Sequence, residues 1–230
     1  MSETVTVSTD AGDMPAHLWL PPTGHGPGIV LVQEIFGVSA YIERRAAQLA
    51  ELGYVVLAPE IYWRIGETTP IEGDGALEKA MGLMQRVDWE AAVADGAAAV
   101  RALRERDETT GEVGLVGFCF GGGLAFNVAA TMPVAALVSY YGSALPGLLE
   151  LAPRVTIPSL HHFGLADSFI DNENVERIRR AVTAQPGTTF HTYEGADHAF
   201  DNEDLPWHHP AASAEAWERT TVFLRTVLPV

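Results

Sequence analysis

The stretch Val113-Gly114-Leu115-Val116-Gly117-Phe118-Cys119-Phe120-Gly121-Gly122-Gly123 passes from an apolar run into a run of glycines. Such a transition predicts a buried strand that turns sharply into a helix. At the turn, Gly117, Cys119 and Gly121 follow the pattern glycine, any residue, cysteine, any residue, glycine. Side chains two positions before and after the cysteine would collide in a strained turn of this kind, so glycine is needed at both places. The pattern places the thiol of Cys119 at the tip of the turn.

This position favours a chemical role for Cys119. A helix that begins directly after the cysteine brings backbone N–H groups and a positive dipole end to the sulfur, where they stabilise a thiolate and a developing oxyanion. The N–H of Phe120 is one expected oxyanion donor. A lone cysteine is more often buried and inert, with a catalytic role in roughly one case in ten. A phosphate-binding loop is excluded, because neither Gly-x-Gly-x-x-Gly nor Gly-Lys-Ser/Thr can be read through these glycines.

The rest of the chain predicts an α/β fold with a mainly parallel, twisted sheet and helices on both faces. Short apolar or β-branched runs bounded by glycine and proline alternate with longer segments of helical period. A serine, Ser39, can cap one helix, and Asp88 precedes another. The expected strands are Thr4–Ser8 and Ala16–Leu20, which could form an antiparallel pair, then Gly28–Gln33, Tyr54–Ala58, Val113–Gly117, Val134–Tyr140, Ser159–Phe163 and Thr188–Tyr193. The expected helices run from Ser39 to Leu52, from Asp88 to Arg106, and near Asn174–Ala184 and Ala214–Val227.

Two further polar residues follow later strands in a meaningful order. Asp167 comes shortly after the strand Ser159–Phe163, and His198 follows the strand Thr188–Tyr193. The carboxyl ends of parallel strands lie on one edge of a sheet, so both side chains are expected on the edge that carries Cys119. Nucleophile, acid and histidine then appear in the chain order that hydrolases of this architecture use. Each residue alone would more often be structural, but the three ordered positions together predict a catalytic triad.

Composition limits the other possibilities. A chain of 230 residues with 47% hydrophobic content can bury one core, so a single domain over residues 1–230 is expected. A net charge of -16 with 14 basic residues argues against nucleic acid or an anionic membrane as partner. The start of the chain has no signal-peptide pattern and a single cysteine forms no internal disulfide, so a reducing cytoplasm is expected. The histidines lack metal-ligand spacing, and no metal is expected.

At Gln33-Glu34-Ile35-Phe36-Gly37, taken together with Gly117 to Gly122, Asp167 and Gly195-Ala196-Asp197-His198-Ala199-Phe200, the chain resembles the dienelactone hydrolase family. The resemblance spans nearly the whole chain. It implies an α/β-hydrolase fold without a large cap domain, a hydrolase that opens a lactone or cleaves an ester, and no cofactor. The partner would be a small-molecule substrate, and the protein a monomer or small homo-oligomer.

The family resemblance also implies roles for individual residues. Glu34 would pair with the resting thiol and take its proton when substrate binds. An ordinary thiol has a pKa near 8.5 and is only about 3% thiolate at pH 7, so either Glu34 or His198 has to activate it. The amides of Ile35 and Phe120 would stabilise the oxyanion, and ring opening would leave a thioester on Cys119. His198, oriented by Asp167, would then deprotonate the water that releases the acid.

The chain departs from the family pattern in the substrate pocket. Well-studied dienelactone hydrolases hold the substrate carboxylate with two arginines, and the corresponding positions here are Leu77 and Asn202. Arg86 or Lys79 would have to compensate, although neither matches by position. Two aromatic residues at pocket positions, Phe36 and Tyr141, either form a pocket wall or simply pack in the core.

Three functions therefore stay open from sequence alone. The first is lactone or enol-lactone hydrolysis, and the second is a general carboxylesterase or thioesterase activity on an uncharged substrate with the same triad. The third is a low-turnover binding or redox-sensing protein on the same fold. An intact set of Cys119, Asp167 and His198 argues against a binder, and the lack of a second cysteine weakens the sensor.

Overall fold

The computed structural model describes residues 2–230. The first residue of the expected domain, Met1, lies outside the described residues. The chain divides into two compact units. The first runs to Leu115 and includes Val230, and the second covers Val116–Pro229. Strand β5 (Thr109–Phe118) begins in the first unit and ends in the second. The single domain over residues 1–230 stays a prediction.

The first unit is built on the strand order β1-β2-β4-β3-β5. Strands β1 (Glu3–Thr9) and β2 (Gly12–Trp19) form the expected antiparallel hairpin, and β2 also pairs antiparallel with β4 (Val55–Pro59). Strand β3 (Gly26–Val32) runs parallel to β4, with Gly28 opposite Val55. Every residue of β3 is buried, which explains its unbroken apolar sequence. Helices α1 (Ala40–Glu51) and α3 (Trp89–Arg104) pack on these strands.

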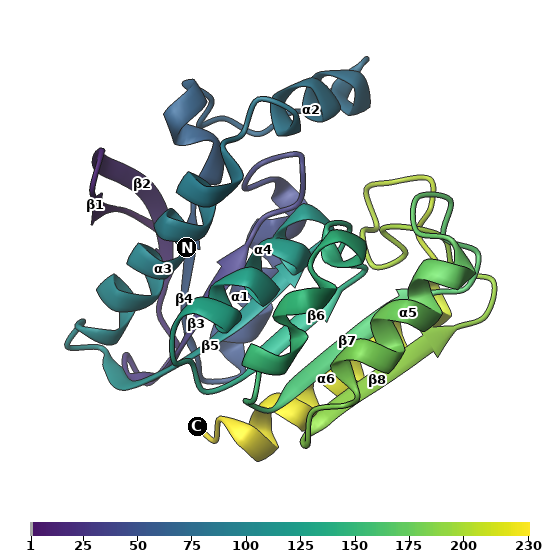
Figure 1. The fold of residues 1–230 in the computed structure, drawn as a ribbon. Helices are drawn as coiled ribbons and strands as arrows, with labels where there is room; N and C mark the ends of the chain where they lie inside the picture. The colour runs from purple at the N-terminus through teal and green to yellow at the C-terminus, as the bar shows by residue number, and fades with distance from the viewer. Residues whose placement is uncertain (1) are drawn as a thin grey trace. The chain divides into compact units, whose positions relative to one another are not determined.

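The second unit continues from β5 through three parallel strands, β6 (Leu137–Tyr140), β7 (Ser159–Gly164) and β8 (Thr188–Tyr193). Figure 1 shows these strands side by side, with α6 (Pro210–Val227) against β7. Helix α4 (Phe120–Thr131) follows β5 directly and packs on β6, and α5 (Asn172–Val182) connects β7 to β8. The prediction of an α/β fold with mainly parallel strands is confirmed.

Several local expectations differ from the structure. Ser39 occupies the N-cap position of α1, but its side chain makes no capping hydrogen bond, whereas Asp88 accepts one from the N–H of Ala91 at 3.1 Å. Strand β2 begins four residues earlier than expected, because the hairpin turn is tight, and β6 begins at Leu137 rather than Val134. The sequence reading also missed α2 (Ala76–Met84) and the short 3-10 helices η1 (Ile61–Ile65), η2 (Leu145–Gly147) and η3 (Leu149–Arg154).

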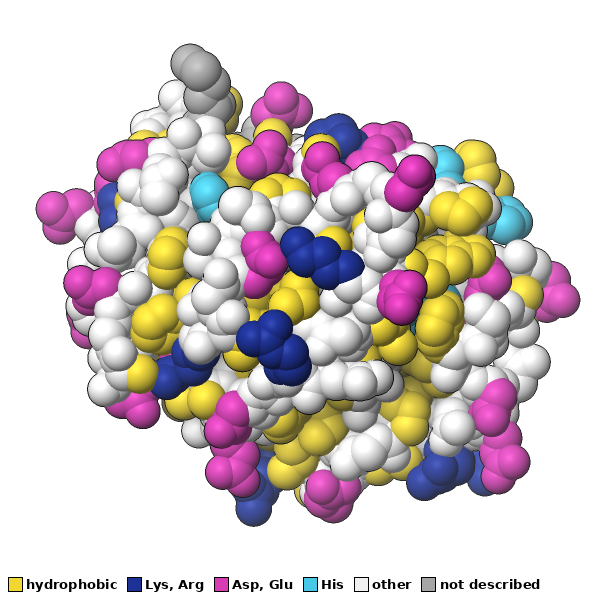
Figure 2. Space-filling view, turned by 90° about the horizontal axis from the view of Figure 1, so that it is seen from above, with side chains coloured by type: hydrophobic (Ala, Val, Ile, Leu, Met, Phe, Trp, Pro, Cys, Tyr) yellow, Lys and Arg dark blue, Asp and Glu magenta, His cyan; other side chains and the backbone are white. Residues whose placement is uncertain are grey.

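Acidic side chains outnumber basic ones in this chain. Figure 2 shows Asp and Glu side chains scattered over one face, with fewer Lys and Arg side chains between them. This distribution follows from 30 acidic against 14 basic residues in the chain. In residues 2–230, no helix combines the length and the apolar character needed to cross a membrane.

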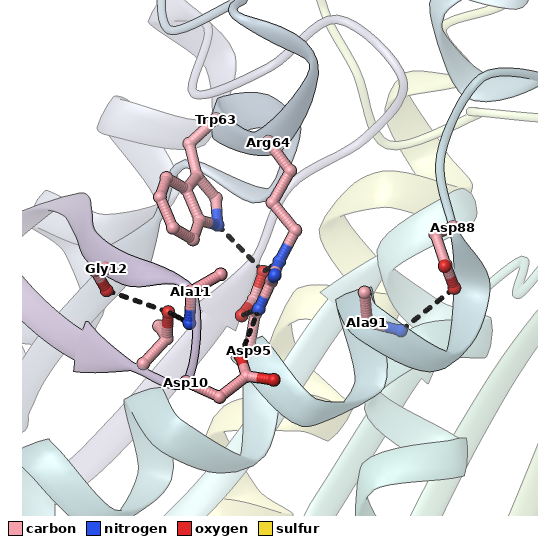
Figure 3. A network of polar contacts seen from close by, with 9 residues as sticks. Asp10, Ala11, Gly12, Trp63, Arg64, Asp88, Ala91 and Asp95 are labelled. Atoms are coloured by element: carbon pink, nitrogen blue, oxygen red, sulfur yellow. Dashed lines mark hydrogen bonds and ion pairs between the residues drawn. The ribbon is translucent and has the colours of Figure 1, made fainter.

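A buried ion pair holds η1 against α3 in the first unit (Figure 3). Asp95 of α3 is fully buried, and its two oxygens accept hydrogen bonds from Nε and Nη2 of Arg64 at 2.8 and 2.7 Å. The indole N–H of Trp63 donates to the same carboxylate at 2.7 Å, and Arg64 also reaches Asp10 at 2.6 Å. These hydrogen bonds raise the pKa of Arg64 above its already high value. The forked geometry compensates for the burial of Asp95 and fixes the chain just after β4.

Two adjacent histidines on β7 are fully buried in different surroundings. His162 shares hydrogen bonds with Tyr193 at 2.8 Å and with Thr220 at 3.0 Å. Neither ring nitrogen of His161 has a hydrogen-bond partner among residues 2–230, and its ring contacts those of Phe126 and Phe190. Burial lowers the pKa of His161 to about 3 and that of His162 well below its usual value. Both rings are therefore neutral in the folded protein near pH 7.

The substitution His161→Leu is expected to stabilise the protein, and more so in acid. Removing an unpartnered buried polar group gains about 1 to 3 kcal/mol in the free energy of unfolding. Because the pKa of His161 is lowered on folding, the unfolded chain binds its proton first, and stability is lost as pH falls from the unfolded value near 6.5 towards 3. The leucine variant escapes this loss of about 1.4 kcal/mol per pH unit.

Urea unfolding at pH 7.5 and pH 5 tests this expectation, with the exposed His25→Leu as the matched control. His162 contributes the same pH dependence to every variant, so differences between variants isolate His161. A gain in stability that does not grow at pH 5, or an equal gain in the His25 variant, would contradict it.

Candidate active site

The turn around Cys119 has the strain that its glycines predict. Cys119 adopts φ 53° and ψ -117°, a conformation that residues with a side chain rarely adopt, and it is the N-cap of α4. A Cβ added to Gly117 would lie 2.1 Å from the carbonyl oxygen of Gly121, so the chain passes itself too closely there for any side chain. The N–H of Cys119 donates to the carbonyl of Tyr140 at 3.0 Å, which anchors the turn to β6.

The structure brings Cys119, His198 and Asp167 into one hydrogen-bonded chain within the second unit. The Nε2 atom of His198 lies 3.1 Å from Sγ of Cys119, and its Nδ1 atom lies 2.9 Å from Oδ2 of Asp167. All three are buried, with Cys119 7% and His198 5% exposed. Along the chain, Asp167 lies 48 positions after Cys119, and His198 lies 31 positions after Asp167; the neighbouring strands β5, β6, β7 and β8 bring them together.

The carboxylate of Asp167 is held from both sides. Its Oδ2 atom faces His198, and its Oδ1 atom accepts hydrogen bonds from the N–H groups of Phe169 and Ile170, both at 2.8 Å. The carboxylate therefore fixes its own loop and leaves one oxygen for the imidazole. This arrangement sets the ring orientation of His198 and directs Nε2 to the sulfur.

The protonation state of His198 follows from its neighbours. Burial by itself lowers the pKa of His198, but the Cys119 sulfur and the Asp167 carboxylate outweigh it and raise that pKa to about 10. The imidazole of His198 therefore carries a proton at neutral pH, and its Nε2 lies 3.1 Å from Sγ of Cys119. A protonated imidazole at this distance can donate a hydrogen bond to the sulfur and can give a proton to a leaving group.

Two residues near the triad were missed by the sequence reading. Ser143 lies in the loop after β6, with its Oγ 3.9 Å from Sγ of Cys119, and its N–H donates to the carbonyl of Cys119 at 3.1 Å. Asp197 joins the two loops that carry the acid and the base, because its Oδ1 accepts from the N–H of His198 at 2.6 Å and from the N–H of Ser168 at 2.7 Å. Although partial burial opposes it, these N–H groups hold the pKa of Asp197 below its usual range.

We expect Asp197→Ala to lower kcat about tenfold, because both loops lose a charge-assisted acceptor beside His198. Asp197→Asn keeps an oxygen acceptor and should retain most of the activity. The exposed Glu194→Ala in the same loop is the control. Steady-state kinetics with a fixed ester measures the effect, and equal rates for the alanine and asparagine variants would show that the acceptor does not matter.

The other predicted site residues occupy defined places. Glu34 follows β3 and is 1% exposed, and Ile35 and Phe36 after it are also buried. Phe120 is the first residue of α4. Tyr141 is fully buried, with its ring centroid 5.2 Å from that of His198, so it packs directly beside the histidine. Its role in substrate binding, like that of Phe36, stays a prediction.

The family departures also have local explanations. Asn202 is buried, and its side-chain oxygen accepts from the N–H of Asp204 at 3.0 Å, so it stabilises a turn. Leu77 is partly exposed on α2. Of the two basic residues that were candidates to compensate, Lys79 pairs with Glu67 at 3.1 Å, and Arg86 donates to the carbonyl of Ile65 at 3.3 Å. Among residues 2–230, no three His, Cys, Asp or Glu side chains gather as metal ligands would.

Comparison with known proteins places the chain in a family. The family model described as "Dienelactone hydrolase family" matches residues 14–228. The chain belongs to the dienelactone hydrolase family. The resemblance seen in sequence is thereby confirmed, and membership makes the chain a hydrolase of lactone or ester bonds.

Individual relatives match the sequence of this dienelactone hydrolase family member over most of their length. A carboxymethylenebutenolidase of Pseudomonas sp. (strain P51) is 35% identical over 221 residues, which cover 95% of this chain and 92% of that protein. One from Pseudomonas putida is 37% identical over 206 residues, covering 89% and 87%. The crystal structure of a putative dienelactone hydrolase from Klebsiella pneumoniae superposes with a TM-score of 0.84 at 26% identity, covering 97% of each chain. The predicted α/β-hydrolase fold is confirmed by these neighbours.

Proposed function

We propose that this protein hydrolyses a lactone or carboxylic ester of a small molecule through a thioester on Cys119, with His198 as the base and Asp167 as its orienting acid. The observation that carries the proposal is the continuous hydrogen-bonded chain from Asp167 through His198 to Cys119, with distances of 2.9 and 3.1 Å. The strained turn that presents the sulfur supports it. We place this activity in the cytoplasm and assign it no cofactor.

The first half of the reaction forms the thioester. The thiolate of Cys119 attacks the carbonyl carbon, and the carbonyl oxygen becomes an oxyanion. We assign the stabilisation of this oxyanion to the N–H groups of Phe120 and Ile35. The tetrahedral intermediate collapses with cleavage of the bond to the leaving oxygen, which takes the proton from Nε2 of His198. In a lactone both products stay in one molecule, as an acyl group on sulfur and a free hydroxyl or enol.

The second half of the reaction releases the acid. Neutral His198 removes a proton from water, and the resulting hydroxide attacks the thioester carbon. The sulfur leaves as a thiolate, and the imidazolium remains beside it, so the ion pair is restored. The Asp167 carboxylate keeps the imidazole oriented through both halves.

We assign Glu34 the accessory role that the family resemblance implies. We propose that its carboxylate accepts the thiol proton when the active-site cysteine is protonated, so that substrate meets a thiolate. Its support is its position two residues after the end of β3 and its near-complete burial, since a buried carboxylate is a common proton acceptor at catalytic sites. The proposal predicts that Glu34→Gln slows formation of the thioester more than its hydrolysis.

A direct test combines turnover with trapping of the intermediate. A dienelactone, an uncharged aryl ester and an acyl thioester are offered to the protein at neutral pH, and rapidly quenched samples are examined by mass spectrometry. We expect hydrolysis of at least one substrate, with the acyl mass on the peptide that contains Cys119. Hydrolysis without acylation of Cys119 would overturn the mechanism, and no hydrolysis of any substrate would favour the binding or redox-sensing role.

A general esterase or thioesterase is the second candidate, and it is favoured by Leu77 and Asn202 at the positions of the family arginines. Each missing charge-assisted contact would remove about 1.5 to 3 kcal/mol of binding to a substrate carboxylate. The ratio of kcat/KM values on the three substrates distinguishes the two activities.

A further inference from the structure

An exposed aromatic residue stands beside the catalytic histidine. Phe169 is 51% exposed, although its ring centroid lies 4.9 Å from that of His198. Trp207 meets Phe169 edge to face, with centroids 6.2 Å apart and ring planes at 84°. A phenylalanine that leaves half of its surface in water next to a reactive group is available to a ligand. We refer to Phe169 and Trp207 as the aromatic pair.

Both rings of the aromatic pair are held by ordered loops. The N–H of Phe169 donates to the Asp167 carboxylate at 2.8 Å, so the ring is carried by the hydrogen bonds that orient the triad acid. The loop of Trp207 is closed by bonds from the N–H of His208 to the carbonyl of Leu205 at 3.2 Å and from the N–H of His209 to the carbonyl of Phe200 at 2.9 Å. The pair is therefore preorganised, which lowers the entropic cost of binding a ligand.

The same two loops are strongly acidic. Residues 164–171 and 194–209 contain no lysine or arginine. They contain seven carboxylates, namely Asp167, Asp171, Glu194, Asp197, Asp201, Glu203 and Asp204. This charge repels an anionic substrate and leaves an uncharged aromatic one unaffected. The aromatic contact and the negative charge therefore both favour an uncharged aromatic substrate.

The part of the substrate that lies against the aromatic pair follows from the geometry of the reaction. The leaving oxygen has to approach Nε2 of His198 closely enough to take its proton. The group bonded to that oxygen is then the part of the substrate nearest to Phe169, which contacts the same imidazole. From this geometry we infer that the aromatic pair binds an uncharged aromatic leaving group, so the protein prefers neutral aryl esters or aryl-fused lactones to anionic dienelactones. This assignment rests on the proposed function.

Kinetics on three esters test the assignment. Phenyl acetate supplies a neutral ring, 2,2,2-trifluoroethyl acetate an activated leaving group without a ring, and 4-carboxyphenyl acetate a charged ring. We expect Phe169→Ala and Trp207→Ala each to raise KM for phenyl acetate about tenfold, with kcat changed less than about twofold. For trifluoroethyl acetate, the same variants should change KM less than about threefold. Val222→Ala, which trims another exposed apolar side chain on α6, should leave all constants unchanged.

The charge preference has its own readout. We expect wild-type kcat/KM for phenyl acetate to exceed that for 4-carboxyphenyl acetate by at least about tenfold in low salt, and the ratio to shrink at high salt because the repulsion is screened. Equal effects of Phe169→Ala on the aryl and alkyl esters would overturn the aromatic contact. A preference for the charged ester would overturn the charge selection.

Binding to an inactive protein separates this inference from the proposed function. In Cys119→Ala, titration of phenyl acetate followed by ligand NMR should show binding that is weakened about tenfold by Phe169→Ala. If the wild type hydrolyses none of the esters but this difference in binding is found, the proposed function fails and the aromatic site stands. If esters are hydrolysed but binding is insensitive to both aromatic residues, the proposed function stands and the aromatic site is wrong.

Discussion

Cys119→Ala is expected to reduce kcat by roughly 10³ to 10⁶, because in the proposed function the acyl intermediate forms on Cys119 and only binding and oxyanion stabilisation would remain. The backbone should be unaffected, since alanine keeps the Cβ that the conformation at φ 53° already accommodates. His198→Gln is expected to have an effect of similar size, because glutamine cannot transfer a proton to the leaving group or from water. The double variant should be hardly slower than either single variant, since the two residues act as a unit.

The measurement compares initial rates for whichever ester or lactone the wild type hydrolyses fastest. His208→Gln, in the loop that follows His198, is the matched control and should leave the rate unchanged. Circular dichroism and thermal unfolding confirm that the variants are folded. Retention of more than about a tenth of the wild-type rate in Cys119→Ala would show that another group is the nucleophile.

Gly117→Ala is expected to produce the largest loss of stability among single substitutions in the turn. The added methyl group would lie 2.1 Å from the oxygen and 2.5 Å from the carbonyl carbon of Gly121. Both are backbone atoms of α4, so relief requires the helix to move away from β5. We expect a loss of at least about 4 kcal/mol in the free energy of unfolding, or no folded protein at all, and loss of activity with it.

Gly82→Ala in α2 is the control, because a Cβ there meets nothing within 4 Å. It should be neutral or stabilising by up to about 1 kcal/mol, since alanine favours a helix. Urea unfolding of the purified variants measures both effects. A Gly117→Ala protein within about 1 kcal/mol of the wild type would show that the turn can relax, and that the glycine is not a steric requirement.

Local features of the chain could be recognised without a structure. The alternation of apolar strands and helical segments predicted the α/β class, and Gly117 and Gly121 predicted the strained turn at Cys119. Asp167 and His198 were identified because each follows a strand in a parallel sheet, where topology brings loop residues to one edge. The helices between Ile61 and Met84 were harder to predict from sequence, because they are short and the segment is interrupted by glycine and proline. Helix α2 was missed for this reason.

The sequence by itself determined the strand-to-helix turn and the fold class, because these depend on sterics and periodicity within a few residues. It also predicted the triad of Cys119, Asp167 and His198, from the order in which these residues follow the strands. Tertiary structure decided that Asp197 joins the loops of the acid and the base, that Ser143 approaches the thiol, and that Phe169 meets Trp207 beside His198. Where these contacts join different loops, the two residues are 24 to 38 positions apart in sequence. Such contacts depend on how every intervening strand and helix packs. No short-range sequence pattern is sufficient to predict that packing.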